Sequence, residues 1–260
     1  MAVAGIDVGS LTTKAVVLED GKILYQGIEV TAEDADTSTR MILDKFLKGK
    51  GLSIDGLKPI GCTGVGRKDL SFADVRKANP LCLARGIHEL LPSVRTIIDI
   101  GAETSHVIKL NDRGQLQDSV VQDKCGAGSG TFLEAITKVL QMSLEEMSQR
   151  ALQAKGRAEI GNTCAIFIEQ EVISHLHKDP PTPVNEVIAG VFGAMAVRAM
   201  GMVRTVGLMP DVALCGGVAK NAGMVKALEE ELGVRVLVPE EPQLVAALGA
   251  ARIAQERAGM

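Results

Sequence analysis

Short apolar runs alternate with amphipathic segments along the chain, which is the pattern of an α/β protein. The run Ala2–Asp7 leads into Gly9 and predicts a buried strand. A second run, Ala15–Leu18, is followed by Asp20-Gly21, a pair that favours a tight hairpin. Further strands are predicted over residues 23–30, 57–62, 97–100, 107–110, 212–214 and 234–238, and helices over 35–47, 81–91, 130–140, 144–154, 164–177, 184–206, 219–232 and 244–256.

The opening pattern returns once in the chain. Asp7 and Gly9 recur as Asp99 and Gly101, an offset of 92 residues, and each copy is followed by a second apolar run and a hairpin signal. A single Asp-x-Gly is a weak signal, but matching flanks favour duplication over coincidence. We therefore expect two similar α/β lobes, 1–95 and 96–242, with the segment 243–260 packing back on the first lobe.

Composition excludes several classes of protein. With 28 basic and 32 acidic residues, the net charge is −4, which disfavours a strongly basic nucleic-acid binder. One Tyr, five Phe and no Trp leave little for base stacking. No apolar run reaches about 18 residues, so no membrane span is expected. Five widely spaced cysteines, an odd number, predict a reduced cytoplasmic protein rather than a disulfide framework.

The two Asp-x-Gly turns are candidate phosphate sites. Glycine in a tight turn lets backbone N–H groups approach phosphate oxygens, and neighbouring hydroxyl and ammonium groups can add donors. The candidate phosphate-binding residues are Gly9, Ser10, Thr12, Thr13, Lys14 and Gly101. Asp7 is expected to hold a hydrated Mg²⁺, and Asp99 offers the same geometry from the second lobe. The alternative is two ordinary β-turns.

A late glycine pair completes a series of three motifs. Gly216-Gly217 ends a predicted strand and precedes Asn221, so a base or ribose could lie against the backbone there. Asp-x-Gly-Ser, Asp-x-Gly and Gly-Gly-x-x-x-Asn, in this order, resemble the phosphate-1, phosphate-2 and adenosine motifs of the actin, Hsp70 and sugar-kinase superfamily. The resemblance implies two ribonuclease-H-like lobes that bind ATP with Mg²⁺ in the cleft between them.

Two cysteines stand in polar, glycine-rich surroundings before predicted helices. Cys125 lies in Asp-Lys-Cys-Gly-Ala-Gly-Ser-Gly, and Cys164 follows Asn162 and Thr163, either of which could cap the next helix. A helix N-terminus stabilises a thiolate. These two thiols could be ligands of a four-thiolate cluster, which would need two chains, or of a bridging Zn²⁺. The third interpretation is two unrelated thiols, which the spacing alone favours. The other three cysteines are expected to be packing residues: Cys62, Cys82 and Cys215.

The cysteine motifs resemble one family closely. Asp-Lys-Cys-x-Ala-Gly-x-Gly-x-Phe-Leu and Thr-Cys-x-x-Phe-x-x-x-Glu-Val-Ile-Ser are similar to those of the ATPase/activator family of 2-hydroxyacyl-CoA dehydratases and benzoyl-CoA reductases, and the likeness spans nearly the whole chain. It implies a homodimer, or a heterodimer with a sister chain, bridged by one [4Fe–4S] cluster on Cys125 and Cys164. It also implies nucleotide contacts at Ala102 and Gly128, ferredoxin or flavodoxin as electron source, and an Fe–S enzyme as acceptor.

One position departs from the family pattern. The activators commonly read Asp-Ile-Gly-Gly-Gln-Asp, whereas this chain has Ala102, Glu103 and Thr104 after Gly101. A carboxylate at Glu103 can orient a water or act as a base. Together with the aspartates of the two phosphate motifs, this makes Asp7, Asp99 and Glu103 the catalytic candidates. The resemblance implies ATP-driven, one-electron donation. The alternatives are a small-metabolite kinase of the same superfamily and a non-redox regulatory ATP-binding protein.

Overall fold

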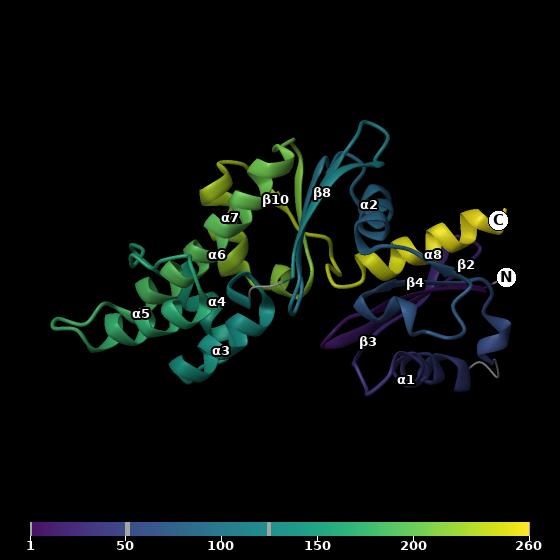
Figure 1. Ribbon diagram of the computed structural model, residues 1–260, viewed down its shortest axis with the longest axis horizontal. Coiled ribbons are helices and arrows are strands. Elements are labelled where there is room, and N and C mark those ends of the chain that lie inside the picture. The colour runs from purple at the N-terminus through teal and green to yellow at the C-terminus, as the bar shows by residue number, and fades with distance from the viewer. Residues whose placement is uncertain (1, 50–52, 124–125, 260) are drawn as a thin grey trace. The chain divides into compact units, whose positions relative to one another are not determined.

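The chain folds into two compact units, each built on its own sheet. The computed structural model describes residues 2–49, 53–123 and 126–259. Unit 1 takes the chain up to Val94, residues 110–116 and everything from Gln243, and unit 2 takes residues 95–109 and 117–242. Each sheet has five strands and is accompanied by helices (Figure 1). The mixed α/β fold predicted from the alternating pattern is confirmed.

The same strand order is found in both sheets. The first runs β3-β2-β1-β4-β5 and the second β8-β7-β6-β9-β10, with antiparallel pairing of β1 to β2 and β6 to β7, and parallel pairing of β1 to β4 and β6 to β9. The strands are β1 (Ala2–Val8), β2 (Thr12–Glu19), β3 (Lys22–Val30), β4 (Ile60–Gly64), β5 (Val75–Arg76), β6 (Thr96–Ile100), β7 (Ser105–Leu110), β8 (Leu116–Gln122), β9 (Val212–Cys215) and β10 (Val236–Leu237).

The helices agree with the predicted segments, with shifts at several ends. Those of unit 1 are α1 (Ala35–Lys48), α2 (Asn79–Leu90) and α8 (Val245–Arg257), and those of unit 2 are α3 (Gly130–Leu140), α4 (Leu144–Leu152), α5 (Ala165–His177), α6 (Val184–Val206) and α7 (Ala222–Leu232). The largest shift is at α7, which was predicted from residue 219. A 3-10 turn, η4 (Gly217–Lys220), occupies that stretch, and the Asn221 side chain caps the helix behind it.

The hairpin predicted at Asp20-Gly21 is confirmed. Both residues have positive φ, 50° and 77°, and Glu19 pairs with Lys22 across the two-residue loop. These are the dihedrals that match a tight turn to the right-handed twist of the flanking strands, and Asp-Gly is a pair that adopts them readily.

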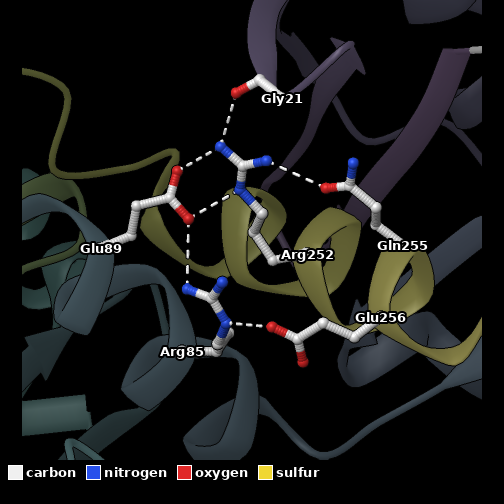
Figure 2. Close-up of polar contacts among 6 residues, drawn as sticks. All are labelled: Gly21, Arg85, Glu89, Arg252, Gln255 and Glu256. Carbon is white, nitrogen blue, oxygen red and sulfur yellow. Dashed lines mark hydrogen bonds and ion pairs between the residues drawn. The ribbon is translucent and has the colours of Figure 1, made fainter. Parts of the chain in front are cut away.

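Helix α8 packs closely within unit 1. It lies on β1, β2 and β4 and along α2, with buried alanines such as Ala247 and Ala251 on the contact face. Polar contacts fasten its C-terminal half (Figure 2): the Arg252 guanidinium binds the Glu89 carboxylate through two nitrogens, at 2.6 and 2.5 Å, and donates to the Gly21 carbonyl at 2.8 Å. Arg85 bridges Glu89 and Glu256. The network therefore joins α8 to α2 and to the β2–β3 hairpin.

Helix α6 is the core helix of unit 2. By length and composition alone it could cross a membrane, but 61% of its most apolar window is buried inside the protein. Val191, Phe192 and Met195 are among its residues in the main apolar cluster. Burial of this kind is typical of a core helix, and the sequence contributes aliphatic and methionine side chains there together with one aromatic residue, Phe192.

Candidate functional site: two phosphate turns and a cysteine-bearing helix end

The first Asp-x-Gly turn joins β1 to β2 and is closed by hydroxyl groups. The Gly9 amide donates to the Thr12 carbonyl at 3.2 Å. Thr31, at the end of β3, donates its hydroxyl to the Gly9 carbonyl at 2.9 Å and lies 3.1 Å from the Thr13 hydroxyl. Thr13 is fully buried, so its hydroxyl serves the turn. Ser10 is exposed at the tip and remains the better placed phosphate donor.

A carboxylate and an ammonium group face each other at the root of this turn. Asp7 is only 8% exposed, and its Oδ2 lies 3.4 Å from Lys14 Nζ, which also donates to the Thr12 carbonyl at 3.0 Å. A single, nearly buried carboxylate beside a candidate phosphate-binding turn suits Mg²⁺, because this ion keeps most of its waters and takes few protein ligands. Asp7 could therefore hold the ion through water, and Lys14 could meet an anion.

The second turn reproduces the first in unit 2. The Gly101 amide donates to the Thr104 carbonyl at 2.9 Å, the bond equivalent to that between Gly9 and Thr12. Asp99 is 7% exposed and lies opposite His106 across the β6–β7 ladder, as Asp7 lies opposite Lys14. Glu103 is exposed within the turn. The 92-residue repeat therefore reflects one backbone geometry that occurs twice.

Each aspartate also lies against a glycine of the neighbouring parallel strand. Gly64 and Gly216 have φ of 89° and 85°, and each is followed by a four-residue 3-10 turn. A Cβ built on Gly64 would lie 2.5 Å from Asp7 Oδ1, and one on Gly216 would lie 3.0 Å from Asp99 Oδ1. Both the dihedral and the space require glycine here, which gives the Gly216-Gly217 motif a structural role beside its predicted adenosine contact.

Two further candidates have local partners. Asn221 is 8% exposed; its oxygen accepts from the Met224 amide at 3.1 Å and its NH₂ donates to the Leu144 carbonyl at 3.2 Å. Its side chain thus caps α7 and joins it to the start of α4. The Gly128 carbonyl accepts a hydrogen bond from the Ser105 hydroxyl at 2.9 Å. The contacts of Asn221 and Gly128 with a nucleotide stay predictions.

The cysteines fall into two environments. Cys62, Cys82 and Cys215 are buried, as expected. Burial raises the pKa of the Cys62 and Cys82 thiols to about 12, and raises the pKa of Cys215 well above its usual value, with Asp99 adding to the effect. Cys164 is half-buried and is itself the N-cap of α5, so the predicted cap at Asn162 or Thr163 is wrong. Cys125 lies outside the described residues.

Cys164 begins a helix with an exposed apolar side. No side chain caps α5 within the described residues, which leaves amide N–H groups of its first turn directed at this end. Ile166, Phe167 and Ile173 are 66%, 58% and 42% exposed. Large apolar side chains exposed together on one helix are typical of surfaces used in protein–protein contacts.

The residues that hold these turns in place could not be read from the sequence. Thr31, Ser105 and Thr131 each direct a hydroxyl to a turn carbonyl, at Gly9, Gly128 and Ala102. Arg198, a cation in the middle of the apolar helix α6, donates to the carbonyls of Asn162 and Thr163. Hydrogen bonds to backbone carbonyls leave no spacing pattern. The one available signal was a guanidinium in the middle of an apolar helix, with the helix's other arginine, Arg204, in its last turn.

A repeated β-sheet with an Asp-x-Gly turn in each copy and a glycine pair directly after β9 is the arrangement predicted for an actin-like fold. The chain belongs to the BadF/BadG/BcrA/BcrD ATPase family, whose model matches residues 4–254. This confirms the resemblance drawn from the cysteine motifs.

Similar proteins extend over nearly the whole chain. The activator of lactoyl-CoA dehydratase from Anaerotignum propionicum is 41% identical over 258 residues, covering 99% of both chains. The crystal structure of Acidaminococcus fermentans (R)-2-hydroxyglutaryl-CoA dehydratase component A has a TM-score of 0.93 at 32% identity, with full coverage of both chains. The activator of the 2-hydroxyisocaproyl-CoA dehydratase from Clostridium difficile, with bound ADPNP, has a TM-score of 0.92 at 34% identity, covering 100% of this chain and 96% of that one. These neighbours confirm the predicted fold class.

Proposed function

We propose that this protein is an ATP-dependent activator that donates single electrons to an Fe–S enzyme of the 2-hydroxyacyl-CoA dehydratase or benzoyl-CoA reductase type. The observation that carries the proposal is Cys164, which is half-buried at an uncapped helix end while Cys62, Cys82 and Cys215 are buried. The similarity to dehydratase activators over 99% of the chain supports the acceptor class. The neighbour with bound ADPNP supports ATP and ADP as ligands.

The donor set fits a cluster that two chains share. The described residues contain no group of three or more metal-ligating side chains, so these residues of one chain do not enclose a cluster on their own. Cys125 and Cys164 from each of two chains would supply four thiolates, the ligand set of a [4Fe–4S] cluster. When bound, such a cluster supplies a one-electron couple. The exposed side chains of Ile166 and Phe167 support a dimer, or a heterodimer with a sister chain, because a second chain would remove them from water.

The nucleotide is assigned to the two turns. Ser10, Thr12 and Lys14 would bind phosphate oxygens. Gly9 and Gly101 would let the backbone of each turn come close to the phosphates. Asp7 would hold Mg²⁺ through water, and Asp99 would complete the polar lining. Glu103, exposed in its turn, would orient the attacking water. Gly216 and Gly217 would lie against adenosine. The described cysteines are all free thiols, which supports a reduced, cytoplasmic setting, with a ferredoxin or flavodoxin as the electron source.

Iron and acid-labile sulfide analysis of anaerobically purified protein tests the proposal. We expect four irons per two chains. Cys125→Ser and Cys164→Ser should each lose the cluster, because one missing thiolate per chain removes two of four ligands. Cys62→Ser is the matched control and should keep the cluster, because Cys62 is a buried thiol whose raised pKa disfavours the thiolate that a metal ligand requires.

The outcomes separate the candidate functions. Full iron and visible absorbance in both ligand variants would refute the assignment of the thiolates. Wild-type protein without iron would refute electron donation and leave a kinase or a regulatory ATP-binding protein. Coupling is tested by the EPR signal of the reduced protein, which we expect to differ between ADP and a non-hydrolysable ATP analogue. Identical spectra in both nucleotides would mean that ATP does not act on the cluster.

A further inference from the structure

Arg198 reaches the backbone just before Cys164. Its side chain projects from the middle of α6, and Nη1 donates to the carbonyl oxygens of Asn162 and, at 3.1 Å, of Thr163. These two residues directly precede Cys164, the N-cap of α5. Both hydrogen bonds come from one terminal nitrogen, whose two hydrogens can each meet a carbonyl, so a charged donor holds two successive backbone oxygens.

The other side of the same guanidinium lies against the segment that follows Cys125. The 3-10 turn η3 (Gly126–Gly128) ends at Gly128, where a Cβ would lie 3.6 Å from Arg198 Nε and 3.9 Å from its Cδ. The Nε–H is buried and has no acceptor among residues 2–49, 53–123 and 126–259. The Arg198 side chain therefore binds the segment just before Cys164 and lies beside the turn that follows Cys125.

Hydrogen bonds continue from η3 to the second phosphate turn. Ser105, the first residue of β7, donates its hydroxyl to the Gly128 carbonyl at 2.9 Å. The Gly130 amide donates to the Gly101 carbonyl at 2.8 Å, and the Thr131 amide to the Ala102 carbonyl at 2.9 Å. The start of α3 is thus bonded directly to the turn that carries Glu103, and every contact in this series lies within unit 2.

We propose that Arg198 is a positioning residue that transmits a change at the second phosphate turn to the segment around Cys164. A shift of the turn carbonyls moves the N-terminus of α3 and η3 with it, because they share hydrogen bonds. Arg198, packed on Gly128, carries that shift to Asn162 and Thr163. The inference rests on the proposed function for the identity of the cluster ligands, but the contacts themselves do not depend on it.

Hydrogen–deuterium exchange of the intact protein tests this relay. The segments 126–131 and 160–168 are followed with ADP and with a non-hydrolysable ATP analogue, for wild type, Arg198→Met and the control Arg204→Met, an exposed arginine on the same helix. In wild type and in Arg204→Met we expect the two nucleotides to change exchange at least three-fold in both segments. In Arg198→Met the difference should persist in 126–131 and disappear in 160–168.

Arg198→Lys provides a second variant should Arg198→Met fail to fold. It keeps the charge, but its side chain is shorter and its nitrogen does not extend as far from α6 as Nη1 of Arg198, so we expect at least a two-fold smaller nucleotide response in 160–168 than in wild type. An unchanged response of 160–168 in the variants would overturn the proposal, and so would a wild-type protein that responds in neither segment. Iron analysis of the same samples keeps the two claims apart, since absent iron refutes electron donation and leaves the exchange result to judge Arg198.

Discussion

Asp7 and Asp99 owe their position to residues with no side chain. Gly64, the last residue of β4, and Gly216, directly after β9, have φ of 89° and 85° and leave room for a carboxylate where a Cβ would collide. The sequence predicted the two aspartates from their repeat, but not these partners. Gly64 and Gly216 are 152 residues apart, whereas the two aspartates are 92 residues apart. The difference arises because the chain from β6 to β9 is longer than the equivalent chain from β1 to β4.

Glu103 gives the sharpest test of hydrolysis. We expect Glu103→Ala to slow steady-state ATP turnover by about 10²- to 10⁴-fold, the range typical of a lost general base, while nucleotide affinity changes little. The side chain is exposed in its turn, so its removal should leave the fold intact. Phosphate release and equilibrium nucleotide binding are the two measurements.

Glu134→Ala, at an exposed position of α3, serves as the control and should turn over at the wild-type rate. Normal turnover in Glu103→Ala would remove this carboxylate from the mechanism and leave water positioning to another group.

The buried thiols predict a loss of stability in alkali. Burial raises the pKa of Cys62 from an ordinary 9.0 to about 12 in the folded protein. The unfolded chain therefore releases this proton first, and the contribution of Cys62 to stability, complete below pH 9, is lost as the pH rises toward 12. The difference in unfolding free energy between wild type and Cys62→Ala should shrink from pH 7 to pH 10 in urea titrations.

Val17→Ala removes buried apolar volume from β2, two strands away from Cys62 in the same sheet, without removing a titrating group. Its cost should be the same at both pH values. A Cys62→Ala difference that is equally independent of pH would contradict the raised pKa.

The packing of helix α8 requires its backbone to come very close to those of α2 and β4. A Cβ on Gly249 would lie 1.8 Å from the Cys82 carbonyl oxygen of α2, and one on Gly61 would lie 2.1 Å from the Ala250 carbonyl. These are backbone contacts, which cannot rotate away as a side chain can. The Ala-rich sequence around Gly249 predicted a helix correctly, but periodicity does not report how closely two backbones pack.

Gly249→Ala reverses the usual sign of a glycine-to-alanine change in a helix. Helix propensity alone would stabilise the protein by about 1 kcal/mol. Here we expect destabilisation of about 1–3 kcal/mol or more, because overpacking against a backbone forces α8 away from α2. Gly201→Ala in α6, with nothing within 4 Å of its Cβ, should show the ordinary gain. Urea unfolding measures both, and a stabilised Gly249→Ala would contradict the close packing.

Element boundaries show where sequence patterns stop being informative. Helices α3 and α6 begin and end where the pattern placed them, because long amphipathic or apolar stretches fix their own register. The two-residue strands β5 and β10 are much shorter than a hydrophobic period can define. Of these, β5 was missed and β10 was predicted too long. The 3-10 turn before α7 was missed because its residues also suit a helix.

The two related α/β lobes are the feature of the whole molecule that the sequence predicted best. A strand, an Asp-x-Gly turn and a hairpin, found twice, were enough to expect two related α/β units, and each unit has the order in which strands one to three are antiparallel and the next two parallel. The hydrogen bonds of Arg198 were not predicted, because they join residues that are 35 and 36 positions apart through backbone oxygens.

The place of α8 in unit 1 has a consequence for biosynthesis. A ribosome delivers residues 95–242 before it delivers Val245–Arg257, yet the sheet of the N-terminal unit keeps one face for that helix. Until α8 has been synthesised, this face of the first unit's sheet stays uncovered, whereas the second unit can already pack around α6. The first unit is therefore expected to complete its fold only after the second unit has been synthesised, because its last helix is the final element to leave the ribosome.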